Sequence, residues 1–96
     1  MNQLTLMTTA NRPLRPLVEA ALNNELRLLE AAIKRTEERL RTFENAHDMS
    51  SADFLVRYES DELAETLDFA DWIGEYRLLN RLREKADGYR EISFVN

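Results

Sequence analysis

The sequence of 96 residues contains no cysteine, two glycines, two prolines and no long apolar run. Without cysteine the chain has no disulfide framework and no thiolate metal site, which fits a reducing cytoplasm. So few turn-forming residues argue against a many-stranded sandwich or barrel. No stretch approaches the roughly 18 apolar residues that a membrane-spanning helix requires, and no signal-peptide pattern opens the chain. We therefore expect a cytoplasmic protein that does not bind membranes.

The residues that are abundant favour helix. Leu, Ile, Val and Phe total 25 of 96 residues, which exceeds the roughly 20% below which chains tend to stay disordered. Leu, Ala, Glu and Arg are the commonest residues of the sequence, and all four have high helix propensity. The length suits one small domain. The composition therefore predicts a single all-α domain over residues 1–96, with tails at 1–12 and 89–96.

A long helix is predicted over residues 16–47. The segment Asn11–Pro16 is typical of a helix entry because proline is tolerated in the first turn of a helix. Neither proline nor glycine follows before position 47. Apolar residues then recur in alternating steps of four and three, as in a heptad seam. At 1.5 Å per residue the helix should be roughly 45–48 Å long. The seam consists of Leu22, Leu26, Leu29, Ile33, Thr36, Leu40, Phe43 and His47.

A short helix is expected over 51–59, because Ser50 can cap its start and Asp53 stands at the third helical position. A return helix is expected over 66–87, with Thr66 or Asp68 as its cap and Gly88 as its stop. One helical stripe holds its apolar residues: Phe69, Trp72, Ile73, Tyr76, Leu79, Leu82 and Ala86.

The two tails each contain a possible short strand, Gln3–Leu6 and Ile92–Val95. The helix lengths predict an elongated antiparallel helical hairpin. Its return helix covers about two thirds of the long helix. Leu14, Leu17 and Val18 would then project near or beyond its end. Because exposed apolar stripes of that size mark interfaces, we expect these residues to bind a second protein or a second copy of the chain.

Acidic residues are concentrated in one third of the chain. Residues 48–75 carry nine acidic side chains and one basic one, Arg57. One interpretation is a solvated helix face with favourable charge near a helix N-terminus. The other is a docking surface that attracts a basic partner protein and anchors it with aromatic side chains. The candidate residues are Asp61, Glu62, Glu65, Asp68, Asp71 and Glu75, together with Phe54, Tyr58 and Trp72. Trp72 also suits a core position, whereas Phe54 and Tyr58 suit core and interface equally.

No chemical motif supports catalysis, so we expect neither an enzyme nor a cofactor. The spacing of an EF-hand is absent, and the single histidine lacks the neighbours of a di-iron site. His47 falls where a helix C-terminus can satisfy it. The charge balance, the lack of a helix-turn-helix and a helix too long for a ribbon-helix-helix disfavour nucleic-acid binding. The basic residues Arg77, Arg81, Arg83 and Lys85 suit a solvated face, paired with glutamates of the long helix.

Four segments carry a resemblance: 12–22 (RPLRPLVEAAL), 49–54 (MSSADF), 59–63 (ESDEL) and 67–72 (LDFADW). Together they resemble a family of small prokaryotic helical proteins, the antitoxin-like half of two-gene toxin–antitoxin modules. The resemblance covers most of residues 12–83. Ser60 and Ala64 stand where such relatives often carry glycine, so the turn there is expected to differ. The resemblance implies a role in binding and neutralising a partner without identifying it.

The leading hypothesis is therefore a protein-binding module of antitoxin type that masks a small basic, toxin-like protein. A structural coiled-coil homodimer or scaffold is the alternative, and an accessory subunit that completes an enzyme's site is a third. Acidic docking should weaken as salt rises, whereas an apolar helical seam should be indifferent to it.

Overall fold

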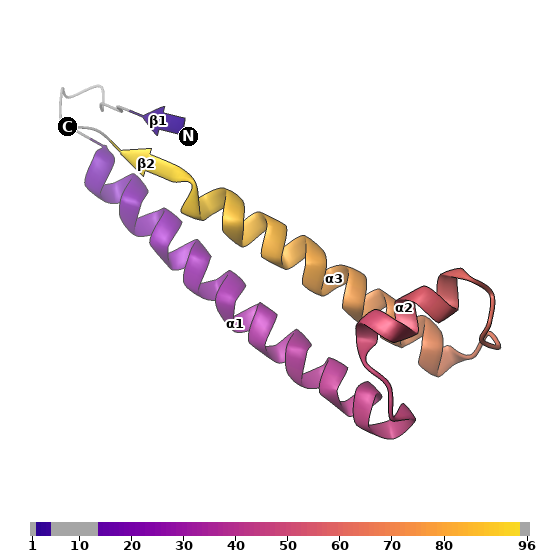
Figure 1. The fold of residues 1–96 in the computed structure, drawn as a ribbon. Coiled ribbons are helices and arrows are strands. Elements are labelled where there is room, and N and C mark those ends of the chain that lie inside the picture. Colours follow the sequence, from indigo (N-terminus) through magenta and orange to yellow (C-terminus); the bar gives the residue numbers. More distant parts are fainter. Residues whose placement is uncertain (1, 5–13, 95–96) are drawn as a thin grey trace.

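The structure, a computed structural model, describes residues 2–4 and 14–94. Its three helices confirm the all-α class (Figure 1). Two three-residue strands pair in parallel, with Asn2 opposite Ile92. The remaining residues of the two expected strands, 5–6 and 95, lie outside the described residues. The elements are β1 (Asn2–Leu4), α1 (Arg15–His47), α2 (Ser51–Glu59), α3 (Leu67–Arg90) and β2 (Ile92–Phe94).

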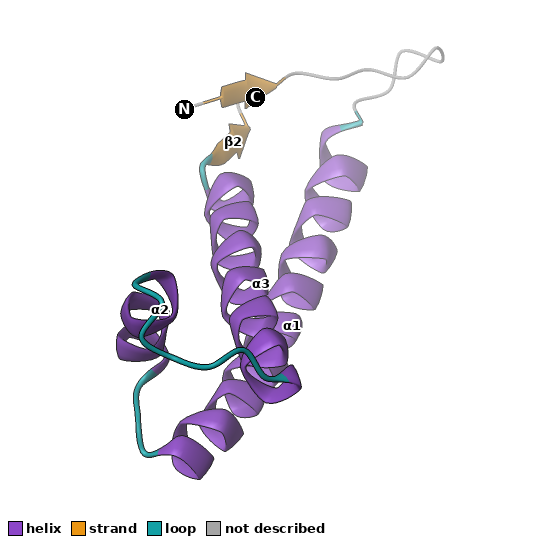
Figure 2. Cartoon of the chain, turned by 90° about the vertical axis from the view of Figure 1, so that its right-hand side faces the viewer, coloured by secondary structure: helices purple, strands orange, loops and turns teal. Residues whose placement is uncertain are grey.

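The molecule is a rod. α3 runs back along α1, and α2 lies at the end where α1 finishes (Figure 1). The extents are 61 × 22 × 18 Å and the radius of gyration is 19.2 Å, whereas a compact chain of this length would have a radius near 12–13 Å. A view turned by 90° shows that α1 and α3 diverge towards the end where α1 begins (Figure 2).

Side-chain caps start two of the helices. The Asp53 backbone N–H donates to Ser50 Oγ at 3.1 Å, as the sequence predicts. The Phe69 N–H donates to Thr66 Oγ1 at 3.0 Å, so Thr66 rather than Asp68 caps α3. Each bond satisfies one of the N–H groups that the first turn of a helix leaves without a partner.

The expected helix stop at Gly88 is wrong. Gly88 has no positive φ, and α3 continues through it to Arg90. The Arg90 guanidinium donates to Glu30 Oε2 of α1 and to Asp87 Oδ1, each at 3.0 Å. These contacts hold the last turn of α3 against α1, so a tertiary contact overrides the local preference of glycine for a helix end.

The buried core gathers where the three helices meet. It consists of Leu40, Phe54, Trp72, Ile73 and Leu79, and Leu29 and Ala86 are buried further along the α1–α3 contact. Thr36 is buried on the same seam, and its hydroxyl donates to the Ala32 carbonyl at 2.8 Å. This bond removes most of the cost of burying a hydroxyl group. None of the described helices is long and apolar enough to cross a membrane.

Candidate functional site

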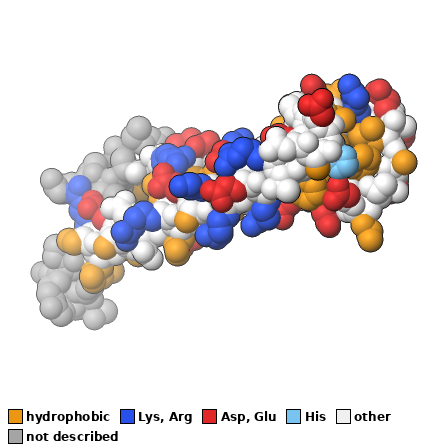
Figure 3. All heavy atoms as spheres, turned by 90° about the horizontal axis from the view of Figure 1, so that it is seen from below, with side chains coloured by type: hydrophobic (Ala, Val, Ile, Leu, Met, Phe, Trp, Pro, Cys, Tyr) orange, Lys and Arg blue, Asp and Glu red, His pale blue; other side chains and the backbone are white. Residues whose placement is uncertain are grey.

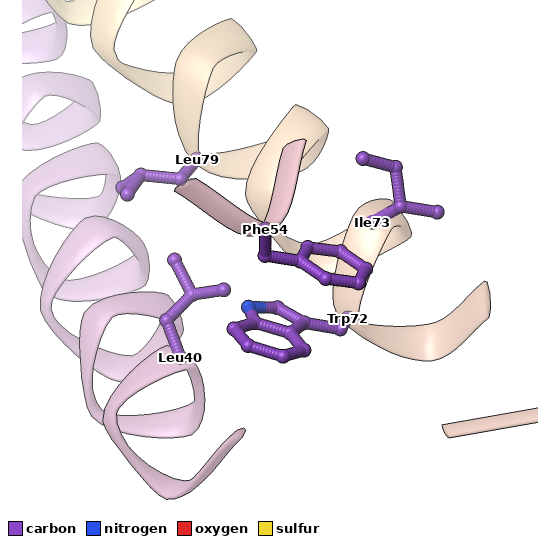
Figure 4. Packing of buried hydrophobic residues seen from close by; sticks show 5 residues of the cluster. All are labelled: Leu40, Phe54, Trp72, Ile73 and Leu79. Carbon is purple, nitrogen blue, oxygen red and sulfur yellow. The ribbon is translucent and has the colours of Figure 1, made fainter. Parts of the chain in front are cut away.

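Trp72 organises the end of the rod that contains the acidic residues. Its indole stacks on the Phe54 ring at a centroid distance of 3.9 Å and on the Phe43 ring at 5.8 Å. Phe43, Phe54 and Trp72 belong to α1, α2 and α3, so one aromatic stack joins all three helices. Leu40 and Leu79 lie beside it in the core (Figure 4). Offset or stacked aromatic pairs add about 0.5–1.5 kcal/mol to the burial of their area.

A chain of hydrogen bonds fixes α2 on this stack. The Trp72 Nε1–H donates to Ser51 Oγ at 2.9 Å, and both residues are buried. The Ser51 backbone N–H in turn donates to Glu44 Oε2 of α1 at 2.8 Å. The first turn of α2 is therefore bonded to both long helices. α2 is thus held in one orientation, which also fixes where the acidic loop after it begins.

Trp72 and Phe54 were candidates both for partner contact and for the core, and the structure places both in the core. Both residues are 0% exposed, so neither presents a surface to a partner in this arrangement. Tyr58 is half-buried against Phe54. These aromatic residues stabilise this end of the rod from its interior, because burying their large apolar area is favourable.

We call residues 48–75 the acidic head. Two of its expected docking residues are engaged with α1 instead. His47 Nε2 lies 2.5 Å from Asp68 Oδ2, and Arg39 Nε lies 3.0 Å from Glu75 Oε2. His47 therefore lies in the last turn of α1, as expected, but its partner is a side chain of α3. Glu75 Oε2 is shielded from solvent and has no aligned hydrogen bond.

Two further ion pairs join the other halves of the long helices. Arg83 donates to Glu37 at 2.8 Å, as the sequence suggests, and Arg90 donates to Glu30. The hydrogen bond to Glu30, with a second one to Asp87, raises the pKa of Arg90 above its ordinary value. The paired side chains are partly solvent-exposed, so each pair contributes little stability. Their value lies in setting the register of α3 on α1.

Four expected docking residues remain exposed: Asp61, Glu62, Glu65 and Asp71. Among residues 2–4 and 14–94, no ion pair engages any of them. Two large apolar side chains are exposed in the same head, Val56 at 63% and Leu67 at 86%. Figure 3 shows acidic and hydrophobic side chains mixed at the end of the molecule that carries the histidine. The head thus combines unpaired negative charge with apolar groups that nothing in the described chain covers.

An open groove of about 510 Å³ lies between α1 and α3 in this region. Phe43, Ala70 and Gly74 supply apolar walls, and Arg39, Thr42, Asp71 and Glu75 complete its lining. A Cβ atom built on Gly74 would meet nothing within 4 Å. Leu67, Ala70, Asp71 and Gly74 follow helical spacing, so they share one face of α3. An apolar side chain of a partner fits this groove, with Asp71 available to a cation beside it.

The sequence does not predict this groove, because its walls come from two helices that lie apart in the chain. A signal was present, since Gly74 stands inside a predicted helix where glycine costs roughly 1 kcal/mol relative to alanine. The expected residues Leu14, Leu17 and Val18 lie in or beside the first turn of α1, at the opposite end of the rod. The candidate residues thus form two separate surfaces.

The polar side chains that line the groove are those of Arg39, Thr42, Asp71 and Glu75. Within 2–4 and 14–94, no group of three or more His, Cys, Asp or Glu side chains is arranged to hold a metal ion. The groove is lined by no serine, cysteine or histidine that could serve as a nucleophile or base. The chain matches no protein-family model, no curated protein and no solved structure. The resemblance to antitoxin-like proteins therefore stays a prediction.

Proposed function

We propose that this chain is a protein-binding module that masks a basic partner protein with its acidic head, in the manner of an antitoxin. The observation that carries the proposal is the groove beside Asp71. It is open, walled by Phe43, Ala70 and Gly74, and bordered by an unpaired carboxylate. In this function the chain acts as the elongated two-helix hairpin in which α1 and α3 present the groove.

The charge of the head favours a basic partner. Residues 48–75 have a formal charge of −8, against −5 for the whole chain. Charge of one sign speeds the encounter with a partner of the other sign and selects against acidic competitors. Affinity must come mainly from apolar contact, because exposed ion pairs contribute little. Leu67 and the groove supply that contact, and fully burying a leucine side chain stabilises a complex by about 1.5–3 kcal/mol.

The partner class that fits is a small cytoplasmic protein with a basic, functionally important surface, such as a ribonuclease-like toxin. The absence of cysteine fits the reducing compartment in which such modules act. The chain itself would contribute no catalysis, cofactor or nucleic-acid contact. Its role would be to occupy the partner's surface.

Co-expression with the product of the neighbouring gene tests the function. We expect the two proteins to co-purify, their affinity to fall as salt rises, and this chain to relieve any growth defect that the partner causes. Two variants address the groove: Asp71→Arg reverses its carboxylate, and Gly74→Leu fills it. Each should weaken binding roughly tenfold or more.

Matched controls exist on the same helix. Glu84→Arg makes the same charge reversal at an exposed position outside the head. Gly88→Leu adds the same side chain at a helical glycine that is equally open. Both controls should bind normally. If all four variants bind alike, or if the neighbouring product neither co-purifies nor changes growth, the proposed function fails.

The second candidate function is a structural homodimer or scaffold. It is favoured by exposed leucines at the other end of α1, Leu17 and Leu28. The two functions differ in their response to salt, because apolar association is not weakened by screening.

A further inference from the structure

α1 carries a second apolar seam that no residue in the described part of the chain covers. Five residues follow steps of four, three, four and three, the spacing of a heptad seam. All five are exposed, and the two leucines are 67% and 57% exposed. At 100° per residue this seam lies roughly 150° around the helix from the seam that faces α3. The second seam consists of Leu17, Ala21, Asn24, Leu28 and Ala31.

This seam is confined to the half of α1 that α3 scarcely reaches. The last residue of α3, Arg90, pairs with Glu30, and Leu29 is still buried in the contact between the two helices. The turns of α1 before Leu29, residues 15–28, therefore extend past the end of α3. These fourteen residues correspond to about 21 Å of helix. Figure 2 shows the two helices diverging towards this end. Beyond residue 31 the same face of α1 becomes polar, beginning with the exposed Arg35.

We propose that a second copy of this chain packs on the second seam, antiparallel, through residues 15–31 of α1. This inference concerns the opposite end of the rod from the acidic head and goes beyond the proposed function. A two-fold axis between residues 22 and 23 makes the seam complementary to itself. It sets Leu17 level with Leu28 of the second copy and Ala21 level with Asn24, and each pairing occurs twice.

The self-complementary pattern favours a second copy over a foreign helix. In an antiparallel pair, leucine meets leucine at both outer positions, and alanine lies beside asparagine near the axis. A single polar residue in such a seam fixes register. Asn24 is already oriented for this role, because Arg27 donates to its Oδ1 at 3.2 Å. Closed two-fold contacts of this kind are the commonest form of assembly.

Charge selects the antiparallel orientation. A parallel pair would bring two acidic heads, each with a formal charge of −8, side by side at one end. An antiparallel pair places the heads at opposite ends of a longer rod. The repulsion between them is then screened, because it acts over several Debye lengths at physiological salt. The dimer would leave both heads and both grooves free.

Sedimentation equilibrium from low micromolar to millimolar concentration tests the self-association. We expect a monomer–dimer equilibrium that salt does not weaken. Leu28→Glu should raise the dissociation constant by about 100-fold, since each dimer loses two buried leucines and gains two buried charges. Leu28→Gln keeps helix propensity and should also weaken the dimer, which guards against a variant that fails to fold.

Val56→Glu is the matched control, because Val56 is as exposed as Leu28 but lies in α2, at the other end of the rod. It should dimerise like the unmodified chain. A monomer at every concentration would overturn the proposal, and so would a dimer that survives Leu28→Glu. Neither outcome bears on binding through the acidic head, so this inference can fail while the proposed function stands.

Orientation is measured with a spin label on Ala52→Cys, the only thiol in that variant. Ala52 lies in α2, next to the end of α1. About 25 residues separate the proposed axis from that end of α1, so antiparallel labels should lie about 75 Å apart. A parallel pair would keep them within roughly twice the 22 Å width of one rod. A short distance would contradict the antiparallel arrangement.

Discussion

Replacing Ser51 with alanine isolates one buried hydrogen bond at the junction of the three helices. Ser51 Oγ accepts the Trp72 Nε1–H at 2.9 Å, and both residues are buried. Alanine removes this acceptor but keeps the backbone N–H that donates to Glu44. The indole N–H would be left unsatisfied, which costs about 1–3 kcal/mol. Alanine's better helix propensity offsets up to about 0.5 kcal/mol.

We therefore expect Ser51→Ala to lower the free energy of unfolding by about 1–2 kcal/mol. For a domain of this size, each kcal/mol corresponds to about 4–8 °C in Tm. Urea unfolding followed by circular dichroism measures the loss. A double-mutant cycle with Trp72→Phe, which keeps an aromatic ring on Phe54, then isolates the coupling between hydroxyl and indole.

Ser60→Ala is the control, because Ser60 is exposed at the other end of α2. Its effect should stay within about 0.5 kcal/mol. If Ser51→Ala is no more destabilising than this control, or if the cycle gives strict additivity, the buried hydrogen bond does not hold α2 in place.

Three further predictions address the helices. Gly74→Ala and Gly88→Ala should each raise the free energy of unfolding by about 0.5–1 kcal/mol, because both glycines are helical and a Cβ meets nothing within 4 Å. A lower Tm in thermal melts would contradict this. Asp48→Gly should raise the free energy of unfolding by up to about 1 kcal/mol, since Asp48 ends α1 with φ 49°. A lower free energy of unfolding in urea titrations would mean that the carboxylate contributes more than the backbone strain costs. Arg83→Gln should cost less than about 1 kcal/mol in low salt and less still in high salt, because its pair with Glu37 is partly exposed; a cost independent of salt would contradict this reasoning.

Local patterns in the sequence predict most of the helical architecture. The long helix and the cap at Ser50 both depend on neighbours within a few residues. The structure confirms the helix through the heptad spacing from Leu22 to His47, and it confirms the cap. The predicted end of α3 was wrong because the true end depends on the contact of Arg90 with Glu30, a residue 60 positions away. A local preference such as that of Gly88 cannot report a contact of this kind.

The candidate site was less accessible to prediction because it depends on register. The sequence identifies the acidic residues, but it cannot separate Asp68 and Glu75, which pair with α1, from Asp71, which lies between them and stays unpaired. The groove has walls from two helices about 30 residues apart in sequence. Composition likewise could not decide between core and surface for Phe54 and Trp72, since both roles suit aromatic residues.

The position of Trp72 gives the chain a built-in optical probe of one region. It is the only tryptophan in the sequence, and its ring stacks against residues of α1 and α2. Its emission should shift to the red when α2 leaves or the helices part at that end. Fraying of residues 15–29 should leave the emission unchanged while ellipticity falls. The gap between the fluorescence and circular-dichroism midpoints therefore measures how independently the far end of α1 melts.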